Sequence, residues 1–98
     1  MPQLSIIVPT YNEAENVRPL VDAISAALAG IDYEMLIVDD DSPDLTWQQA
    51  QEIAKSDRRV RVIRRTGEKG LAASVIEGFT AARGEVLACM DGDLQHDP

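Results

Sequence analysis

Three clusters of polar residues each follow a short apolar run, and their side chains are of the kinds that hold metals and phosphates. The first is Pro9-Thr10-Tyr11-Asn12-Glu13, the second is Asp39-Asp40-Asp41, and the third is Asp91-Gly92-Asp93. Adjacent carboxylates repel one another unless a cation lies among them. Mg²⁺ relieves that repulsion with one or two carboxylates and leaves positions for phosphate oxygens. A metal and a phosphate-bearing ligand are therefore expected where the clusters meet.

Individual residues of these clusters have separable candidate roles. Asp91 and Asp93, with Gln95 as a neutral oxygen donor, are the candidate metal ligands, although Asp-Gly-Asp taken alone is more often a surface turn. Tyr11 offers a ring and Glu13 an acceptor to a heterocyclic base; the competing interpretation is that Glu13 only favours a helix start.

Positive charge near the same clusters is limited to the Arg64-Arg65 pair and Lys69. These cations suit a diphosphate, and the competing interpretation is a solvated loop. Trp47, at a predicted helix start, is expected to pack rather than to stack on a substrate.

Apolar patterning predicts the elements that carry these clusters. Short apolar runs predict strands at residues 4–8, 33–38, 60–63 and 86–90, the third with polar alternation typical of a sheet edge. Helical spacing predicts helices at about residues 17–29, 46–55 and 71–82. The order β-α-β-α-β-α-β predicts an α/β fold, a three-layer α/β/α sandwich with a mostly parallel sheet, in one domain over residues 1–98. Open α/β sheets bind ligands at the carboxyl ends of their strands.

Several local features set the expected helix boundaries and the buried faces. Asn12 or Asn16 is expected to cap the first helix, and Pro19 is expected to confine its start to residue 17. Thr46 and Gln49 have the spacing of a capping box. The third helix is expected to bury the face of Leu71, Val75, Phe79 and Ala82 and to end at Gly84, and Cys89 is expected to be a buried thiol.

Composition excludes several classes of function. The 98 residues contain 9 Lys and Arg against 17 Asp and Glu, a net charge of −8 that disfavours nucleic acid as a partner. The single cysteine allows no internal disulfide, and no signal peptide or membrane span is expected, which favours a cytoplasmic location. P-loop, dinucleotide-binding, zinc and serine-hydrolase motifs are absent from the sequence.

In their order, the clusters resemble the motifs of family 2 glycosyltransferases with the GT-A fold, and most closely the dolichol- or polyprenol-phosphate mannosyltransferase branch. Residues 9–13 resemble P-T-Y-N-E, residues 38–44 resemble V-D-D-x-S-P-D, and residues 91–96 resemble D-A-D-L-Q-H. The resemblance covers the whole chain and implies the Rossmann-like half of that fold.

The resemblance implies a role for each matched residue. Its implied donor-binding residues are Pro9, Tyr11, Glu13, Val38, Asp39, Asp41, Lys69, Asp91 and Asp93. Its implied metal ligands are Asp91, Asp93 and Gln95, holding Mg²⁺ or Mn²⁺. Asp40 or Asp41 would support the ribose or the metal. No catalytic base can be named, and a lipid phosphate acceptor, largely ionised at neutral pH, needs none.

The resemblance implies an inverting, metal-dependent transfer of a hexose, mannose first, from GDP-mannose or else UDP-glucose to polyprenyl phosphate at the cytoplasmic face of a membrane. The acceptor part is expected beyond residue 98, so this segment is expected to be inactive alone and to self-associate through its last strand. The alternatives are another sugar or a soluble acceptor, a Mg²⁺-binding phosphoacceptor signalling domain, and a non-catalytic nucleotide-binding module.

Overall fold

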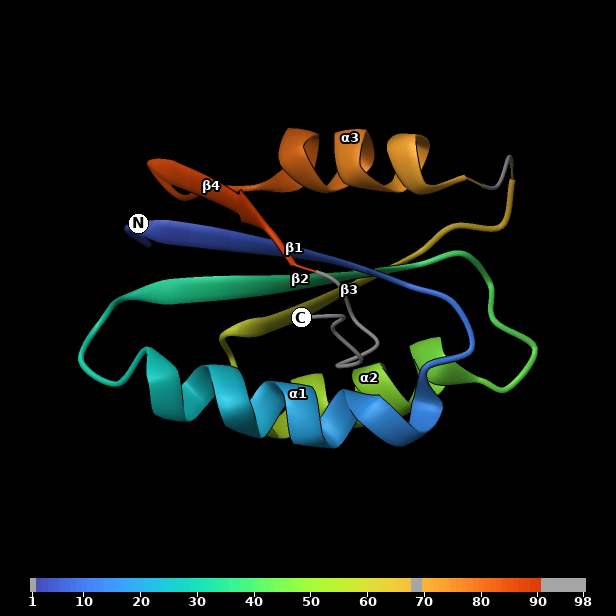
Figure 1. The fold of residues 1–98 in the computed structure, drawn as a ribbon, viewed down its shortest axis with the longest axis horizontal. Helices are drawn as coiled ribbons and strands as arrows, with labels where there is room; N and C mark the ends of the chain where they lie inside the picture. The colour runs from blue at the N-terminus through green and yellow to red at the C-terminus, as the bar shows by residue number, and fades with distance from the viewer. Residues whose placement is uncertain (1, 68–69, 91–98) are drawn as a thin grey trace, which may run out of the picture.

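The computed structural model describes residues 2–67 and 70–90, which form a sheet between two layers of helices (Figure 1). The strands are β1 (Leu4–Thr10), β2 (Tyr33–Asp39), β3 (Val60–Arg64) and β4 (Val86–Cys89). The helices are α1 (Ala14–Ala27), α2 (Thr46–Ser56) and α3 (Leu71–Ala81). All strand pairs are parallel, in the order β3-β2-β1-β4. Helices α1 and α2 cover one face and α3 covers the other, which confirms the predicted three-layer α/β/α fold.

The two central strands bury both of their faces. Alternate residues of a strand point to opposite sides of the sheet. Ile6 and Val8 of β1 therefore pack with α1 and α2, whereas Ile7 packs in a smaller cluster beneath α3. Every residue of β2 is buried. Runs made mostly of apolar residues are typical of such doubly covered parallel strands, so the sequence predicts these two strands well.

Helix α1 begins at Ala14, three residues before the predicted start, and Pro19 lies inside it. The expectation that Pro19 confines the helix start was wrong. A proline inside a helix costs about 3 kcal/mol, because it removes one amide donor and crowds the preceding turn. The helix buries Val17, Leu20, Val21 and Ile24. Burial of each such side chain contributes about 1.5–3 kcal/mol, which outweighs that cost.

Helix α3 presents to the sheet a different face from the one predicted. Its buried residues are Ser74 and Gly78, while Leu71 is 70% exposed and Phe79 is 37% exposed. A Cβ atom on Gly78 would lie 2.5 Å from Cγ2 of Ile7. The helix therefore packs through its small residues, a close approach that hydrophobic periodicity cannot detect.

Strand β4 is an edge strand among the described residues, paired only with β1. Val86 and Leu87 are 60% and 45% exposed. The expectation that Cys89 is buried was wrong, since its side chain is exposed. An apolar run at a sheet edge looks in sequence like a buried strand. Self-association through this edge stays a prediction.

Helix α3 ends at Ala81, so the expectation that Gly84 ends this helix was wrong. Gly84 instead allows the turn after α3 to pack closely against β1. A Cβ atom at this position would lie 2.6 Å from the backbone nitrogen of Ser5 and 2.8 Å from the carbonyl carbon of Leu4. Gly84→Ala is expected to lower the free energy of unfolding by about 1–3 kcal/mol, because a central strand cannot move aside. Urea unfolding measures this change.

Gly67→Ala is the matched control, because a Cβ atom there meets nothing within 4 Å. Equal effects of the two substitutions would contradict this account of Gly84.

Candidate functional site

The carboxyl ends of β1 and β2 are joined by a buried hydrogen-bond network around Asp39. Thr10 Oγ1 donates to Asp39 Oδ1 at 2.6 Å. The backbone N–H of Ser42 donates to Asp39 Oδ2 at 2.8 Å, and Ser42 Oγ donates to Oδ1 at 2.7 Å. Asp39 itself has no exposed surface. Its carboxylate thus fixes the loop after β2 to the end of β1.

The same loop caps the start of α1. The backbone N–H of Glu13 donates to Thr46 Oγ1 at 2.9 Å, and that of Ala14 donates to Asp44 Oδ2 at 3.1 Å. No side chain at the N-cap position bonds the helix, so the predicted caps Asn12 and Asn16 were wrong. Helix N-termini need acceptors, and here a segment 30 residues away in sequence supplies them.

Because Thr46 serves α1, it does not form the predicted capping box with Gln49. The N-cap of α2 is Leu45, in the left-handed region with φ 65°, and its side chain makes no capping bond. The Thr46 hydroxyl donates to the Asp44 carboxylate, and the backbone N–H of Gln49 donates to the Leu45 carbonyl. A capping box is a local pattern, whereas this arrangement depends on the tertiary contact between two loops.

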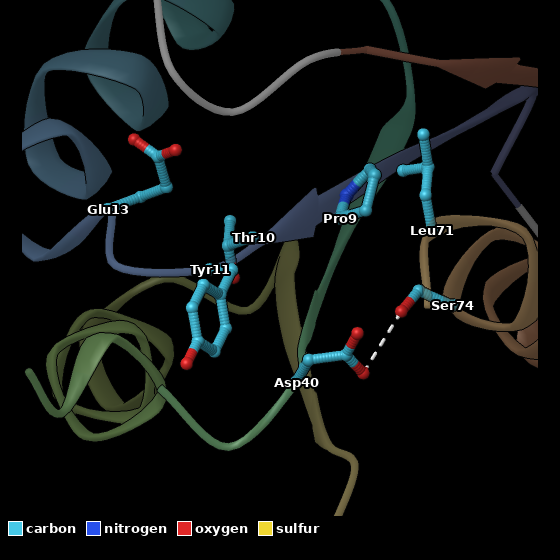
Figure 2. A pocket seen from close by; sticks show the side chains of 7 residues that line it. All are labelled: Pro9, Thr10, Tyr11, Glu13, Asp40, Leu71 and Ser74. Carbon is cyan, nitrogen blue, oxygen red and sulfur yellow. Dashed lines mark hydrogen bonds between the residues drawn. The ribbon is translucent and has the colours of Figure 1, made fainter. Parts of the chain in front are cut away.

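A pocket of about 220 Å³ shares Thr10 with the network around Asp39, and Figure 2 shows the side chains that line it. Its lining residues are Pro9, Thr10, Tyr11, Glu13, Asp40, Leu71 and Ser74. The first four lie within residues 9–13, at and just beyond the end of β1, and the last two lie one turn apart in α3. Tyr11 is 49% exposed, so part of this residue faces solvent at the pocket. Sites for drug-sized ligands measure about 300–1,000 Å³, so this volume suits one part of a nucleotide.

Asp40 joins this pocket to α3 and to the segment after β3. Its carboxylate accepts from the Gly70 N–H at 3.0 Å, from Ser74 Oγ at 3.1 Å and from the Arg65 guanidinium. Burial alone would raise the pKa of Asp40, but these three donors outweigh it and hold the pKa below its ordinary value. Asp40 is therefore an ionised acid at neutral pH.

Arginine side chains pair with two carboxylates of the acidic run at the end of β2. Arg65 pairs with Asp40 and also with Glu77 of α3, at 2.9 Å. Arg64 pairs with Asp41 at 2.7 Å and lies 3.8 Å above the centre of the Trp47 ring. Asp40 and Asp41 thus have cationic partners within the protein, and their role beside the ribose or a metal stays a prediction. Trp47 packs, as predicted.

Unfolding should become easier in acid because of these carboxylates. The pKa of Asp40 and the pKa of Asp44 are both lowered by hydrogen bonds that outweigh burial. A lowered folded-state pKa stabilises the protein above the unfolded value, about 3.9 for Asp, and that stabilisation is lost as pH falls through the folded value. Stability is expected to be flat from about pH 7 to 5 and to fall below about pH 4.

Urea unfolding at a series of pH values measures this profile. Asp44→Asn should reduce the fall in the free energy of unfolding below about pH 4. Glu52→Gln, on the exposed side of α2, should leave that fall unchanged. Unchanged stability down to pH 3 would contradict the assignment.

The structure brings together some of the predicted donor-binding residues and separates others. Pro9, Tyr11 and Glu13 line the pocket. The Val38 and Asp39 side chains are fully buried, and Asp41 is paired with Arg64. Lys69, Asp91, Asp93 and Gln95 lie outside the described residues.

Sequence reasoning missed Leu71 and Ser74 as pocket residues, and it named Thr10 only as a member of the first cluster, without a role. Only the position of Leu71 and Ser74 in the first turn of a helix after a loop could have indicated them. Within residues 2–67 and 70–90 no group of three metal-binding side chains occurs, and no helix is long and apolar enough to cross a membrane.

Residues 5–98 match the family model described as Glycosyl transferase family 2. The chain is 55% identical over 96 residues to a dolichol-phosphate mannosyltransferase of Pyrococcus furiosus, covering 98% of this chain and 27% of that protein. It is 39% identical to the protein of the same name in Saccharomyces cerevisiae, covering 98% of this chain and 37% of that one. The chain thus spans about a third of the length of these relatives.

Solved structures share the fold. A mannosyltransferase from Pyrobaculum calidifontis, in complex with GDP-Man and Mn²⁺, matches with a TM-score of 0.81 and 27% identity over 94% of this chain and 28% of that one. Staphylococcus aureus TarS in complex with UDP matches with a TM-score of 0.77 and 27% identity over 93% of this chain and 27% of that one.

Proposed function

The chain belongs to glycosyl transferase family 2, and from that premise we propose that residues 1–98 are the donor-binding part of a mannosyltransferase acting on polyprenyl phosphate. The observation that carries the proposal is the pocket lined by Pro9, Tyr11, Glu13 and Asp40 at the carboxyl ends of β1 and β2. Open α/β sheets bind their ligands at this edge. The names of the curated relatives and the GDP-Man complex of the Pyrobaculum protein support mannose as the sugar.

The pocket residues suit a base and a ribose. The half-exposed Tyr11 ring offers a stacking face, and the Glu13 carboxylate offers an acceptor to ring N–H groups. Arg64 and Arg65 are engaged by carboxylates of the protein itself. The diphosphate would therefore be neutralised by Lys69 and by a metal rather than by this arginine pair.

Asp91, Asp93 and Gln95 would hold that metal, Mg²⁺ or Mn²⁺. Their position in the chain fits, because the Met90 N–H donates to the Ile7 carbonyl at 2.9 Å and so sets the residue before Asp91 beside β1. Carboxylate and amide oxygens are the donors that these ions prefer. When bound, such an ion stabilises the leaving diphosphate as a Lewis acid. The Mn²⁺ of the Pyrobaculum complex supports a divalent ion.

The acceptor proposed is a polyprenyl phosphate at the cytoplasmic face of a membrane. A phosphate monoester is largely ionised at neutral pH, so it can attack the sugar without a protein base. A direct attack of this kind inverts the anomeric centre.

A chimeric enzyme tests the proposal. Residues 1–98 replace the matching segment of the Pyrococcus relative, and the product is assayed with GDP-mannose or UDP-glucose and with polyprenyl phosphate or a soluble sugar acceptor. Mannosyl transfer to the lipid phosphate is expected, with an activity that depends on Mg²⁺ or Mn²⁺. A well-folded chimera that transfers from neither donor would contradict the donor-binding role.

A second candidate is a family 2 enzyme with another sugar or a soluble acceptor, favoured by the UDP complex of the TarS neighbour. Transfer from UDP-glucose, or to the soluble acceptor alone, would select it in the same assay. The phosphoacceptor signalling alternative is not retained. Such a domain needs an acidic pair after its first strand, whereas β1 is followed here by Tyr11, and Asp40 is ion-paired with Arg65.

A further inference from the structure

A second pocket, of about 260 Å³, lies at the opposite end of the sheet from the donor pocket. It is lined by residues at the start of β2 and around the start of β3, and by the turn between α3 and β4 (Figure 1). The charged residues of its lining are Asp32, Glu34, Arg58, Arg59, Arg61 and Arg83. A seven-residue strand such as β2 spans about 20 Å, so a ligand here would not reach the donor pocket.

The pocket concentrates cations on a chain that is otherwise acidic. Four of the nine lysines and arginines line it, against two acids, whereas the whole chain carries a net charge of −8. Asp57, which pairs with Arg59 at 3.1 Å, adds a third acid beside the pocket and leaves the cations in excess. An anion is therefore the ligand that its charge fits.

Two of the guanidinium groups are held in fixed positions. Arg61 Nη1 donates to Glu34 Oε1 at 2.8 Å and to the Ala81 carbonyl at 3.0 Å. Arg59 is bonded to Asp57 and lies 4.9 Å above the centre of the Tyr33 ring. Each still has N–H donors that no described residue accepts, so the pocket contains preorganised donors.

Glu34 does not cancel this positive charge, because its carboxylate is fully used. It accepts from Ser5 Oγ at 2.6 Å, from the Arg83 backbone N–H at 2.6 Å and from Arg61. Burial alone would raise the pKa of Glu34, but these bonds outweigh it and lower the pKa. Glu34 therefore acts as a fixed anchor for Arg61.

The other two guanidinium groups have no such partner. Within residues 2–67 and 70–90, the Arg58 and Arg83 side chains make no hydrogen bond or ion pair, and both residues are exposed. Two unpaired arginines that line one pocket, beside two anchored ones, supply charged N–H donors of the kind that phosphate oxygens accept.

We propose that this pocket is a second anion site, which binds a phosphate or diphosphate group through Arg58 and Arg83 with Arg59 and Arg61 as fixed donors. Such a group has two possible sources, a soluble phosphate compound or the headgroup of an anionic phospholipid. The proposal is independent of the donor-binding role, because it uses other residues at another edge of the sheet.

The test compares three forms of the chain in EDTA, so that metal-dependent donor binding does not contribute. They are the unchanged chain, the pair Arg58→Gln with Arg83→Gln, and the control pair Arg18→Gln with Lys55→Gln. The control removes the same charge from exposed ion pairs on α1 and α2. Binding of inorganic pyrophosphate is measured by calorimetry, and sedimentation is measured with vesicles of phosphatidylcholine with or without phosphatidylglycerol.

The unchanged chain and the control are expected to bind at least one probe, and the Arg58 and Arg83 pair to lose about tenfold or more of that affinity. Pyrophosphate binding without sedimentation would identify a soluble phosphate as the source. Sedimentation only with phosphatidylglycerol would identify the lipid headgroup. Binding of neither probe, or equal loss in the control pair, would overturn the proposal.

Discussion

Asp39→Ala is expected to lower the free energy of unfolding by about 3 kcal/mol or more, since hydrogen bonds to a charged group contribute about 1.5–3 kcal/mol each. The carboxylate is fully buried and accepts from Thr10 Oγ1 and from both the N–H and the hydroxyl of Ser42. The substitution leaves these buried donors without an acceptor. Urea unfolding at pH 7 measures the loss.

Asp22→Ala is the matched control, because Asp22 is exposed and its pair with Arg18 spans 3.8 Å. Exposed pairs of this kind contribute about 0.3–0.5 kcal/mol. Stability losses of the same size in the two variants would contradict the structural role of Asp39. If donor affinity alone fell in Asp39→Ala, the carboxylate would contact the ligand instead of fixing the loop.

Asp93→Ala is expected to remove metal-dependent donor binding while the fold survives. Even outer partners of metal ligands contribute about 10–100-fold to metal affinity, so loss of a ligand should weaken donor binding in Mn²⁺ by more than about 100-fold. Calorimetry with GDP-mannose measures the affinity, and circular dichroism with thermal unfolding measures the fold.

Glu52→Ala provides the control, since this acid lies on the exposed side of α2, paired with Lys55. It should leave donor affinity unchanged. Donor binding that persists in Asp93→Ala would exclude Asp93 as a metal ligand. A loss of thermal stability that accompanies the loss of binding would make the residue structural.

The sequence predicts the fold well wherever burial is two-sided. The apolar runs 6–8 of β1 and 35–38 of β2 and the apolar stripe of α1 indicated buried strands and a covering helix, and the structure confirms them. The sequence predictions were wrong where a helix packs unusually close to the sheet and where a strand lies at the sheet edge. Gly78 lets α3 approach the sheet through small residues, and Cys89 lies in an apolar strand that forms an edge.

The candidate site could also be predicted only in part. The residue types at the end of β1 predicted a ligand-binding role, and Pro9, Tyr11 and Glu13 do line one pocket. The roles of the acidic run at the end of β2 could not be assigned in this way, because two of its carboxylates have partners distant in sequence. Asp40 pairs with Arg65, and Asp39 accepts from Thr10 as well as from its neighbour Ser42. Residue types alone do not distinguish an acid that binds a ligand from one that fixes a loop.

The most direct test of the central claim is a titration of GDP-mannose into the chain with Mn²⁺ and again in EDTA. Binding with Mn²⁺, weakened about tenfold or more in EDTA, is the predicted result, because the metal would neutralise the diphosphate. Absence of binding in both conditions, or the same affinity in both, would contradict a metal-dependent donor site.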